Sequence, residues 1–142
     1  MSRIFESRKD VRRELATMKS FLKRNKFKYT FEKLDWRSLD FALYDGEQLI
    51  AIVEIKNFRV AWNFFPTTII ALKKYIKMLD VKEEFGVPVY FLVNYSCGTL
   101  AWIEVDSVDG GSKDFERTEM REGAANDAEE VFFVDNKLFK TI

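Results

Sequence analysis

Two carboxylates and a lysine lie inside a stretch that is otherwise typical of an apolar hairpin, LDFALYDGEQLIAIVEIKN, residues 39–57. They are Asp40, Glu54 and Lys56. Two carboxylates in a partly buried site repel each other, and keeping both ionised requires a nearby cation. A hard divalent cation, Mg²⁺ or Mn²⁺, supplies this charge and takes carboxylates, together with a backbone carbonyl such as that of Ile55, as ligands. Such a metal polarises a phosphate and lowers the pKa of a bound water, and Lys56 would stabilise the developing negative charge.

The two carboxylates meet only if the hairpin has the right register, because side-chain direction in a strand alternates with period two. Pairing Asp45 with Leu49 leaves residues 46–48 as a three-residue loop and sets Asp40 directly opposite Glu54. A tight two-residue turn at Asp45 and Gly46 would put Asp40 on the wrong side. The predicted site therefore requires the longer loop or a bulge.

Hydrophobic periodicity predicts the elements around this hairpin. A basic, amphipathic helix is expected first, and Pro66 should begin a second helix through TTIIALKKYIKML. The second helix would present its apolar stripe, Ile69, Leu72, Ile76 and Leu79, to the core. We expect an α/β fold in this order: helix 7–25, strands 26–34, 39–44 and 49–56, the helix after Pro66, and strands 87–95 and 99–105. The chain length favours a single domain over 1–142, with its core at about 6–105, an acidic irregular segment over 106–130, and a C-terminal strand and turn over 131–142.

The composition excludes several kinds of chemistry. The sequence has no histidine, which excludes Ser-His-Asp and Cys-His nucleophile systems and histidine-ligated zinc. Its single cysteine, Cys97, excludes an internal disulfide framework and suits a reducing compartment, and we interpret it as a turn residue. The first residues lack the apolar core of a signal peptide, and no apolar run approaches the roughly 20 residues that span a bilayer. The sequence therefore predicts a cytoplasmic protein without a membrane partner.

The formal net charge is zero, but the charge is unevenly distributed. Residues 1–37 hold twelve Lys and Arg against five Asp and Glu, whereas residues 103–135 hold three against eleven. A basic segment suits a polyanion such as nucleic acid, although a charged helix face is often simply solvated. The aromatic residues Trp62, Phe64 and Phe65 follow the Glu54 strand, where they would either stack on bases or fill the core.

The hairpin sequence LDFALYDGEQLIAIVEIK resembles the signature of the PD-(D/E)XK nuclease superfamily, with Asp40 as its aspartate and Glu54, Ile55 and Lys56 as its E-x-K. The resemblance extends loosely over residues 6–105 and is nearest to the archaeal Holliday junction resolvase-like branch. It implies a restriction-endonuclease-like αβββαβ core, with a mixed sheet flanked by helices, and a metal-dependent nuclease activity on DNA.

The resemblance also implies roles for residues outside the hairpin. Glu14 in the first helix matches a glutamate that joins the metal site, and Glu6 is the alternative for that role. The helix after E-x-K often carries a residue near the scissile phosphate, for which the candidates are Lys73, Lys74 and Tyr75. The expected contacts to the DNA backbone come from the basic residues of both helices: Arg12, Arg13, Lys73, Lys74 and Lys77.

Our hypothesis from the sequence is a Mg²⁺-dependent or Mn²⁺-dependent endonuclease that cuts DNA, structure-specifically if the resolvase likeness holds. Asp40 and Glu54 would hold the metal, and a homodimer would allow one site to act on each strand. The alternative is a non-catalytic module that keeps the nuclease fold and binds nucleic acid or protein. The sequence leaves open which DNA structure is cut and whether RNA is a substrate.

Overall fold

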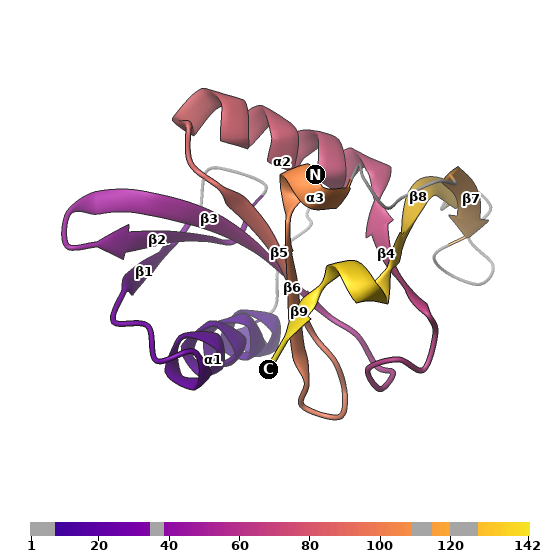
Figure 1. Ribbon diagram of the computed structural model, residues 1–142, viewed down its shortest axis with the longest axis horizontal. Coiled ribbons are helices and arrows are strands. Elements are labelled where there is room, and N and C mark those ends of the chain that lie inside the picture. Colours follow the sequence, from indigo (N-terminus) through magenta and orange to yellow (C-terminus); the bar gives the residue numbers. More distant parts are fainter. Residues whose placement is uncertain (1–7, 35–38, 109–114, 120–127) are drawn as a thin grey trace.

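The computed structural model describes residues 8–34, 39–108, 115–119 and 128–142 of the chain. A central sheet of six strands, in the order β1-β2-β3-β5-β6-β9, is flanked by helix α1 on one side and helix α2 on the other (Figure 1). A second sheet of three strands, in the order β4-β8-β7, adjoins the C-terminal part of the fold. Among all the described residues, no helix has the length and apolar character needed to cross a bilayer.

The described elements follow one another along the chain as predicted for the core, with additions. They are α1 (Arg8–Arg24), β1 (Thr30–Lys33), β2 (Phe41–Asp45), β3 (Gln48–Asn57), β4 (Thr67–Ala71), α2 (Leu72–Phe85), β5 (Val89–Asn94), β6 (Leu100–Glu104), α3 (Val105–Val108), β7 (Phe115–Glu119), β8 (Ala128–Asp135), the 3₁₀ turn η1 (Asn136–Leu138) and β9 (Lys140–Thr141). The strands β3 and β5 are parallel, whereas the other neighbours in the six-stranded sheet are antiparallel, so the sheet is mixed as expected.

Each face of the central sheet is buried by one helix. Met18 and Phe21 of α1 pack on one face against Phe41, Val53 and other apolar strand residues. On the opposite face, Met78 and Val81 of α2 pack in a cluster with further apolar strand residues, among them Ala42, Ile52, Phe91 and Val93. A strand covered on both faces must be apolar on both, which explains the run of apolar residues in β3 and makes a charged residue there costly.

The hairpin of β2 and β3 has a bulge in place of the three-residue loop. Asp45 pairs with Gln48 across a two-residue turn, and Leu43 pairs with Ala51, so the register shifts between Leu43 and Tyr44. Because Tyr44 pairs with Leu49, the extra residue is Ile50. The predicted pairing of Asp45 with Leu49 is therefore wrong. The bulge, which was the alternative to the longer loop, shifts the register so that Phe41 pairs with Val53. As a result, Leu49 packs on the α2 side of the sheet and Ile50 on the α1 side.

Gly46 makes the tight turn of this hairpin possible. Its φ is +64°, and Asp45 pairs with Gln48 on either side of the turn. An L residue with a Cβ is strained in this region, whereas asparagine tolerates it better than other residues. We expect Gly46→Ala to lower the free energy of unfolding by about 1 kcal/mol and Gly46→Asn to lower it less. Urea denaturation of the two variants measures this difference, and equal losses would contradict the turn geometry.

The helix predicted to begin at Pro66 begins later. Residues 67–71 form β4, and α2 starts at Leu72. Two Thr and two Ile in succession are β-branched, and such residues favour a strand. The predicted core stripe is also wrong in part, because Ile69 is 38% exposed and Ile76 is 49% exposed. The buried residues of α2 are Met78 and Val81, with Leu72 and Leu79 partly buried.

The segment 106–130 was expected to be irregular and without a core, and this is wrong for its described parts. It contains most of α3, all of β7 and the beginning of β8, and the side chain of Val108 is fully buried. The final strand expected over 131–142 is present as the end of β8, followed by η1 and β9. The second sheet forms because β8 pairs with β4 on one side and with β7 on the other.

Candidate active site

Asp40 directly precedes β2. The hydrogen bonding between β1 and β2 continues to it, one residue beyond the pair of Lys33 with Phe41. The backbone carbonyl of Asp40 accepts a hydrogen bond from the N–H of Leu34 at 2.9 Å. Its side chain is buried, and Oδ2 accepts a hydrogen bond from the backbone N–H of Ile55 at 2.8 Å. Since Phe41 pairs with Val53, the same register continued by one residue sets Asp40 opposite Glu54. The structure therefore brings the aspartate to the E-x-K strand by the pairing that the sequence predicts.

Glu54 is buried in the middle of the sheet and is 7% exposed. Its Oε2 contacts the Nζ of Lys74 at 3.1 Å, whereas its Oε1 is a buried oxygen without a hydrogen-bond partner in the described part of the chain. Burial, and after it the negative charge of Asp40, raise the pKa of Glu54 to about 8 although the Lys74 ammonium opposes both effects. An unpartnered oxygen in a buried carboxyl is costly, so this group is suited to a cation or a proton.

Lys33 joins the site from β1, and the sequence analysis did not identify it. Its Nζ lies 3.3 Å from Oδ1 of Asp40 and 3.1 Å from Oε1 of Glu14, and it also lies over the ring of Phe41. Glu14 comes from α1 and is thus connected to the site through Lys33. Glu6, the alternative to Glu14, lies outside the described residues. The signal for Lys33 was its spacing of two from Phe31, which places both side chains on one face of β1.

Of the three candidates on the helix after E-x-K, the structure brings Lys74 to the carboxylates. Lys74 reaches Glu54 from the first turn of α2. Lys73 is exposed, and Tyr75 packs partly buried against the core cluster on the α2 side. Lys74 was also expected to contact the DNA backbone, and its ion pair with Glu54 instead places it in the carboxylate cluster.

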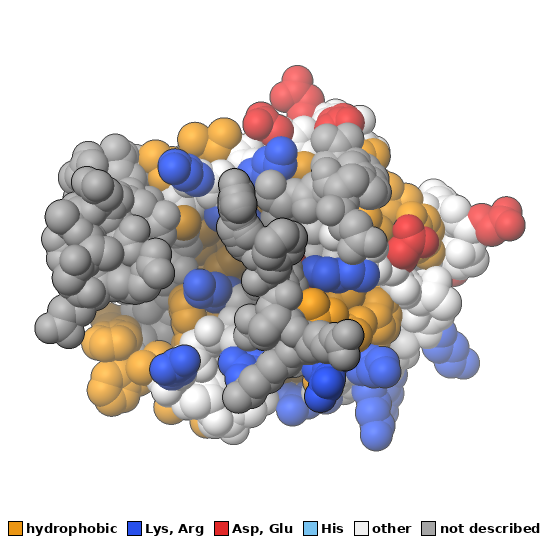
Figure 2. Space-filling view, turned by 180° about the vertical axis from the view of Figure 1, so that it is seen from behind, with side chains coloured by type: hydrophobic (Ala, Val, Ile, Leu, Met, Phe, Trp, Pro, Cys, Tyr) orange, Lys and Arg blue, Asp and Glu red, His pale blue; other side chains and the backbone are white. Residues whose placement is uncertain are grey.

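The remaining predicted residues are more exposed than the two carboxylates. Lys56 follows Glu54 by two positions, and its side chain is exposed. Arg12 and Arg13 are exposed on α1, and Lys77 is half-buried on α2. Figure 2 shows Lys and Arg side chains gathered across the centre and lower part of one face, whereas the described Asp and Glu side chains lie toward its upper and right edges. This face therefore has a basic area among its described residues.

The site contains two carboxylates, which provide the oxygen ligands that a hard divalent cation prefers. Among the described residues, no three carboxylate or thiol side chains converge to form a ready-made cation site. Instead Lys33 neutralises Asp40, and Lys74 neutralises Glu54. The unpartnered Oε1 of Glu54 fits a cation ligand, and the oxygens of Asp40 and the carbonyl of Ile55 are of the same hard type. The residues present therefore fit Mg²⁺ or Mn²⁺ as a ligand set, with two ammonium groups beside it.

Cys97 and the aromatic loop lie away from the carboxylates. Cys97 is exposed in the turn between β5 and β6. Its hydrogen bonds to the Thr99 hydroxyl and from the Trp62 N–H lower the pKa of the thiol to about 7. Trp62 packs edge-on against Tyr95 and Phe139, as expected if it fills the core, whereas Phe64 and Phe65 are exposed.

Comparisons with known proteins concern the family and the fold. A family model described as "Phage putative PDDEXK endonuclease" matches residues 1–142. The structure is similar to that of Hjc, a Holliday junction resolvase from Archaeoglobus fulgidus, with a TM-score of 0.55 and 12% sequence identity over 89% of this chain and 86% of that one. At this identity the likeness concerns the fold alone. A comparison with curated proteins gives no match.

Proposed function

Since the chain belongs to the phage PD-(D/E)XK endonuclease family, we propose that it is a metal-dependent endonuclease that hydrolyses phosphodiester bonds in DNA. Membership confirms the resemblance found in the hairpin sequence. The observation that carries the proposal is the buried, unpartnered Oε1 of Glu54 beside the carboxylate of Asp40. Two carboxylates buried together are costly to a fold, and this cost is explained if they bind a cation.

The proposed roles follow from the contacts. Asp40, Glu54 and the carbonyl of Ile55 hold Mg²⁺ or Mn²⁺, which when bound polarises the phosphate and supplies an acidic water. The N–H of Ile55 fixes the orientation of the Asp40 carboxylate. Lys56, exposed on the same strand, stabilises the charge on the scissile phosphate.

The lysines paired with the carboxylates, Lys33 and Lys74, balance the negative charge of the site when no metal is bound. A divalent cation would replace their charge at the carboxylates, which would allow Lys74 to contact a phosphate oxygen. Glu14 receives Lys33 in this scheme, since the two are already in contact at 3.1 Å. Glu14 thus acts by positioning Lys33.

The substrate that we propose is DNA, held through its backbone by the basic residues Arg12, Arg13, Lys73 and Lys77 on α1 and α2. The fold likeness to a Holliday junction resolvase favours branched DNA as the form to examine first. One site per chain and two strands to cut favour a homodimer.

A metal-dependent cleavage panel tests this proposal. Purified protein is incubated with supercoiled plasmid, linear duplex, a flap, a four-way junction and single-stranded DNA, with Mg²⁺, Mn²⁺ or a chelator. We expect nicked or linear products with either metal and none with the chelator. Retained binding to DNA without cleavage under every metal condition would instead support a non-catalytic module that keeps the fold.

A further inference from the structure

Two adjoining cavities begin where the E-x-K strand ends. A polar cleft of about 310 Å³ lies along Asn57, Asn94 and Gly98, and an apolar pocket of about 350 Å³ lies beyond it. The two cavities share Phe58, Arg59 and Tyr95 in their linings and therefore lie side by side. Arg59 follows Lys56 by three residues, so the cavities begin within about 10 Å of chain from the proposed catalytic lysine. Their volumes are at the lower end of the range found for small-ligand sites.

The polar cleft is suited to an anion. Its charged lining residues are two arginines, Arg13 from α1 and Arg59 from the loop after β3, and both are exposed. Among the described residues, no carboxylate lines it. The floor is fixed by the amide of Asn94, whose Nδ2 donates to Oδ1 of Asn57 at 3.1 Å and to the Thr17 hydroxyl at 3.3 Å. Two arginines and a neutral, hydrogen-bonded amide pair in one cleft match the negative charge and the acceptor oxygens of a phosphodiester.

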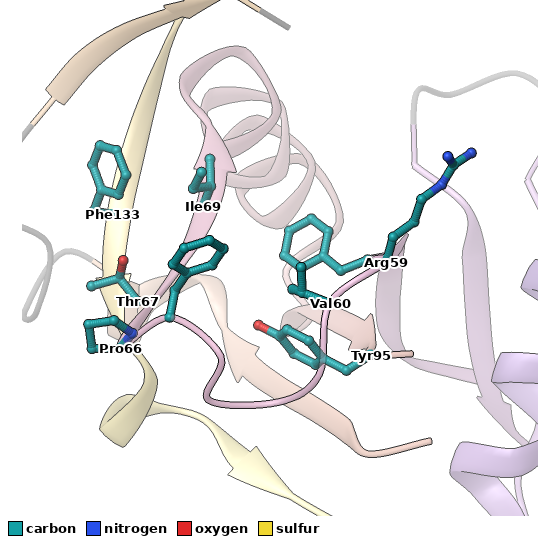
Figure 3. A pocket seen from close by; sticks show the side chains of 9 residues that line it. Arg59, Val60, Pro66, Thr67, Ile69, Tyr95 and Phe133 are labelled. Atoms are coloured by element: carbon teal, nitrogen blue, oxygen red, sulfur yellow. The ribbon is translucent and has the colours of Figure 1, made fainter. Parts of the chain in front are cut away.

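The apolar pocket is suited to a flat ring. Most of its lining residues have aromatic or aliphatic side chains, among them Phe58, Val60, Phe65, Ile69, Tyr95 and Phe133. Figure 3 shows Tyr95, Val60, Ile69 and Phe133 around the cavity, with the Arg59 side chain extending from its edge away from the rings. Phe65 is 55% exposed at the mouth, which is unusual for a phenylalanine and leaves its ring available for stacking.

The wall that carries Phe65 is held in place by a buried polar network. Asn136 donates from Nδ2 to the carbonyl of Phe65 and to Oδ1 of Asn63, each at 2.8 Å, and its Oδ1 accepts from the Thr68 hydroxyl at 2.7 Å. Thr68 in turn contacts the Tyr95 hydroxyl at the floor of the pocket. The loop that presents Phe65 is therefore attached to β4, to η1 and to Tyr95, the residue after β5, so the pocket is formed before any ligand arrives.

We propose that the two cavities form a nucleotide subsite, in which the polar cleft binds a backbone phosphate and the apolar pocket takes an unpaired base. The base would stack on Phe65, while Arg13 and Arg59 contact the adjoining phosphate. This inference rests on the proposed function, and it specifies the substrate class as DNA with an unpaired or extruded nucleotide beside the cleavage position. A fully paired duplex keeps its bases stacked and cannot fill the pocket without the cost of unpairing.

Binding measured without divalent cation tests the subsite separately from catalysis. Fluorescence anisotropy compares a short duplex carrying one unpaired adenine with the fully matched duplex. We expect the wild-type protein to bind the duplex with the unpaired adenine about tenfold more tightly. That adenine can stack in the pocket, whereas the matched duplex offers no unpaired base. Phe65→Ala should reduce the preference to less than about twofold with the matched-duplex affinity unchanged. Phe65→Leu, which keeps apolar bulk, should do the same if the alanine variant fails to fold.

Matched controls come from the connection between α1 and β1. Phe27→Ala removes an aromatic ring that is 43% exposed outside the pocket and should keep the preference. Arg59→Gln should lower the salt dependence of binding by about one unit in the slope of log affinity against log salt. Lys28→Gln should not reduce the preference for the duplex with the unpaired adenine.

Equal affinities of the wild-type protein for the two duplexes would overturn the subsite, even if metal-dependent cleavage is found. A change of oligomeric state in Phe65→Ala, measured by analytical ultracentrifugation, would also overturn it by assigning the pocket to contact between copies. Conversely, a preference without any cleavage would leave the subsite standing and would remove the proposed function.

Discussion

Glu54→Gln is expected to reduce metal-dependent DNA cleavage by at least about a thousandfold, because a metal supplies several kcal/mol of transition-state stabilisation. The amide has nearly the shape of the carboxylic acid but cannot carry the negative charge that holds the cation. Oε1 of Glu54 is the buried oxygen without a partner, so its loss removes a principal ligand. Asp40→Asn should have a similar effect. The measurement is the initial rate of plasmid nicking at saturating Mg²⁺ or Mn²⁺.

The control for this loss is Glu47→Gln, the same isosteric change at the exposed tip of the same hairpin. Its cleavage rate should equal that of the wild-type protein. Circular dichroism of each variant verifies that the fold is retained. Cleavage by Glu54→Gln at the wild-type rate, with the fold intact, would remove the assignment of the site.

The second large effect is on stability, and its direction follows from the raised pKa of Glu54. The pKa is about 8 in the folded protein against a usual value of 4.5. The folded state therefore binds more protons between these values, and the metal-free protein loses stability as pH rises from about 4.5 to about 8. Glu54→Gln has no proton to lose, so its free energy of unfolding should exceed that of the wild-type protein by about 2 kcal/mol at about pH 9. At about pH 4.5 the two should differ little.

Urea unfolding across this pH range, in the presence of a chelator, measures the difference. Glu47→Gln should follow the wild-type curve, because its side chain is exposed. Adding Mg²⁺ or Mn²⁺ above pH 8 should restore the stability of the wild-type protein but not that of Glu54→Gln, since a ligand stabilises only the state that binds it. Parallel pH curves for the wild-type protein and Glu54→Gln would show that burial does not raise this pKa.

The sequence predicted the elements of the core and the encounter of Asp40 with Glu54, because period-two alternation and the turn signal are local properties. It did not predict β4, because a run of Thr and Ile before a helical pattern is compatible with either structure until β8 supplies a partner strand. Lys33 was missed for the same reason. Its role depends on the pairing of β1 with β2 and on the position of α1, both of which are tertiary.

The strand β7 in the segment 106–130 was also not predicted. The composition of this segment is acidic and rich in small residues, which is typical of irregular chain. Strand β7 nevertheless pairs with β8 along its length, and β8 owes its own place to β4. A sheet whose middle strand depends on a partner as distant in the sequence as β4 carries little signal in the segment 106–130 itself.

The bulge at Ile50 separates the two halves of the hairpin. Residues on the tip side of the bulge follow one alternation of faces, and residues on the Glu54 side follow the other. The two-residue turn therefore does not determine the face of the sheet on which the two carboxylates lie, because the bulge sets it. In terms of evolution, the tip of the hairpin is free to change its turn, while the single inserted residue keeps Glu54 and Asp40 in phase with each other.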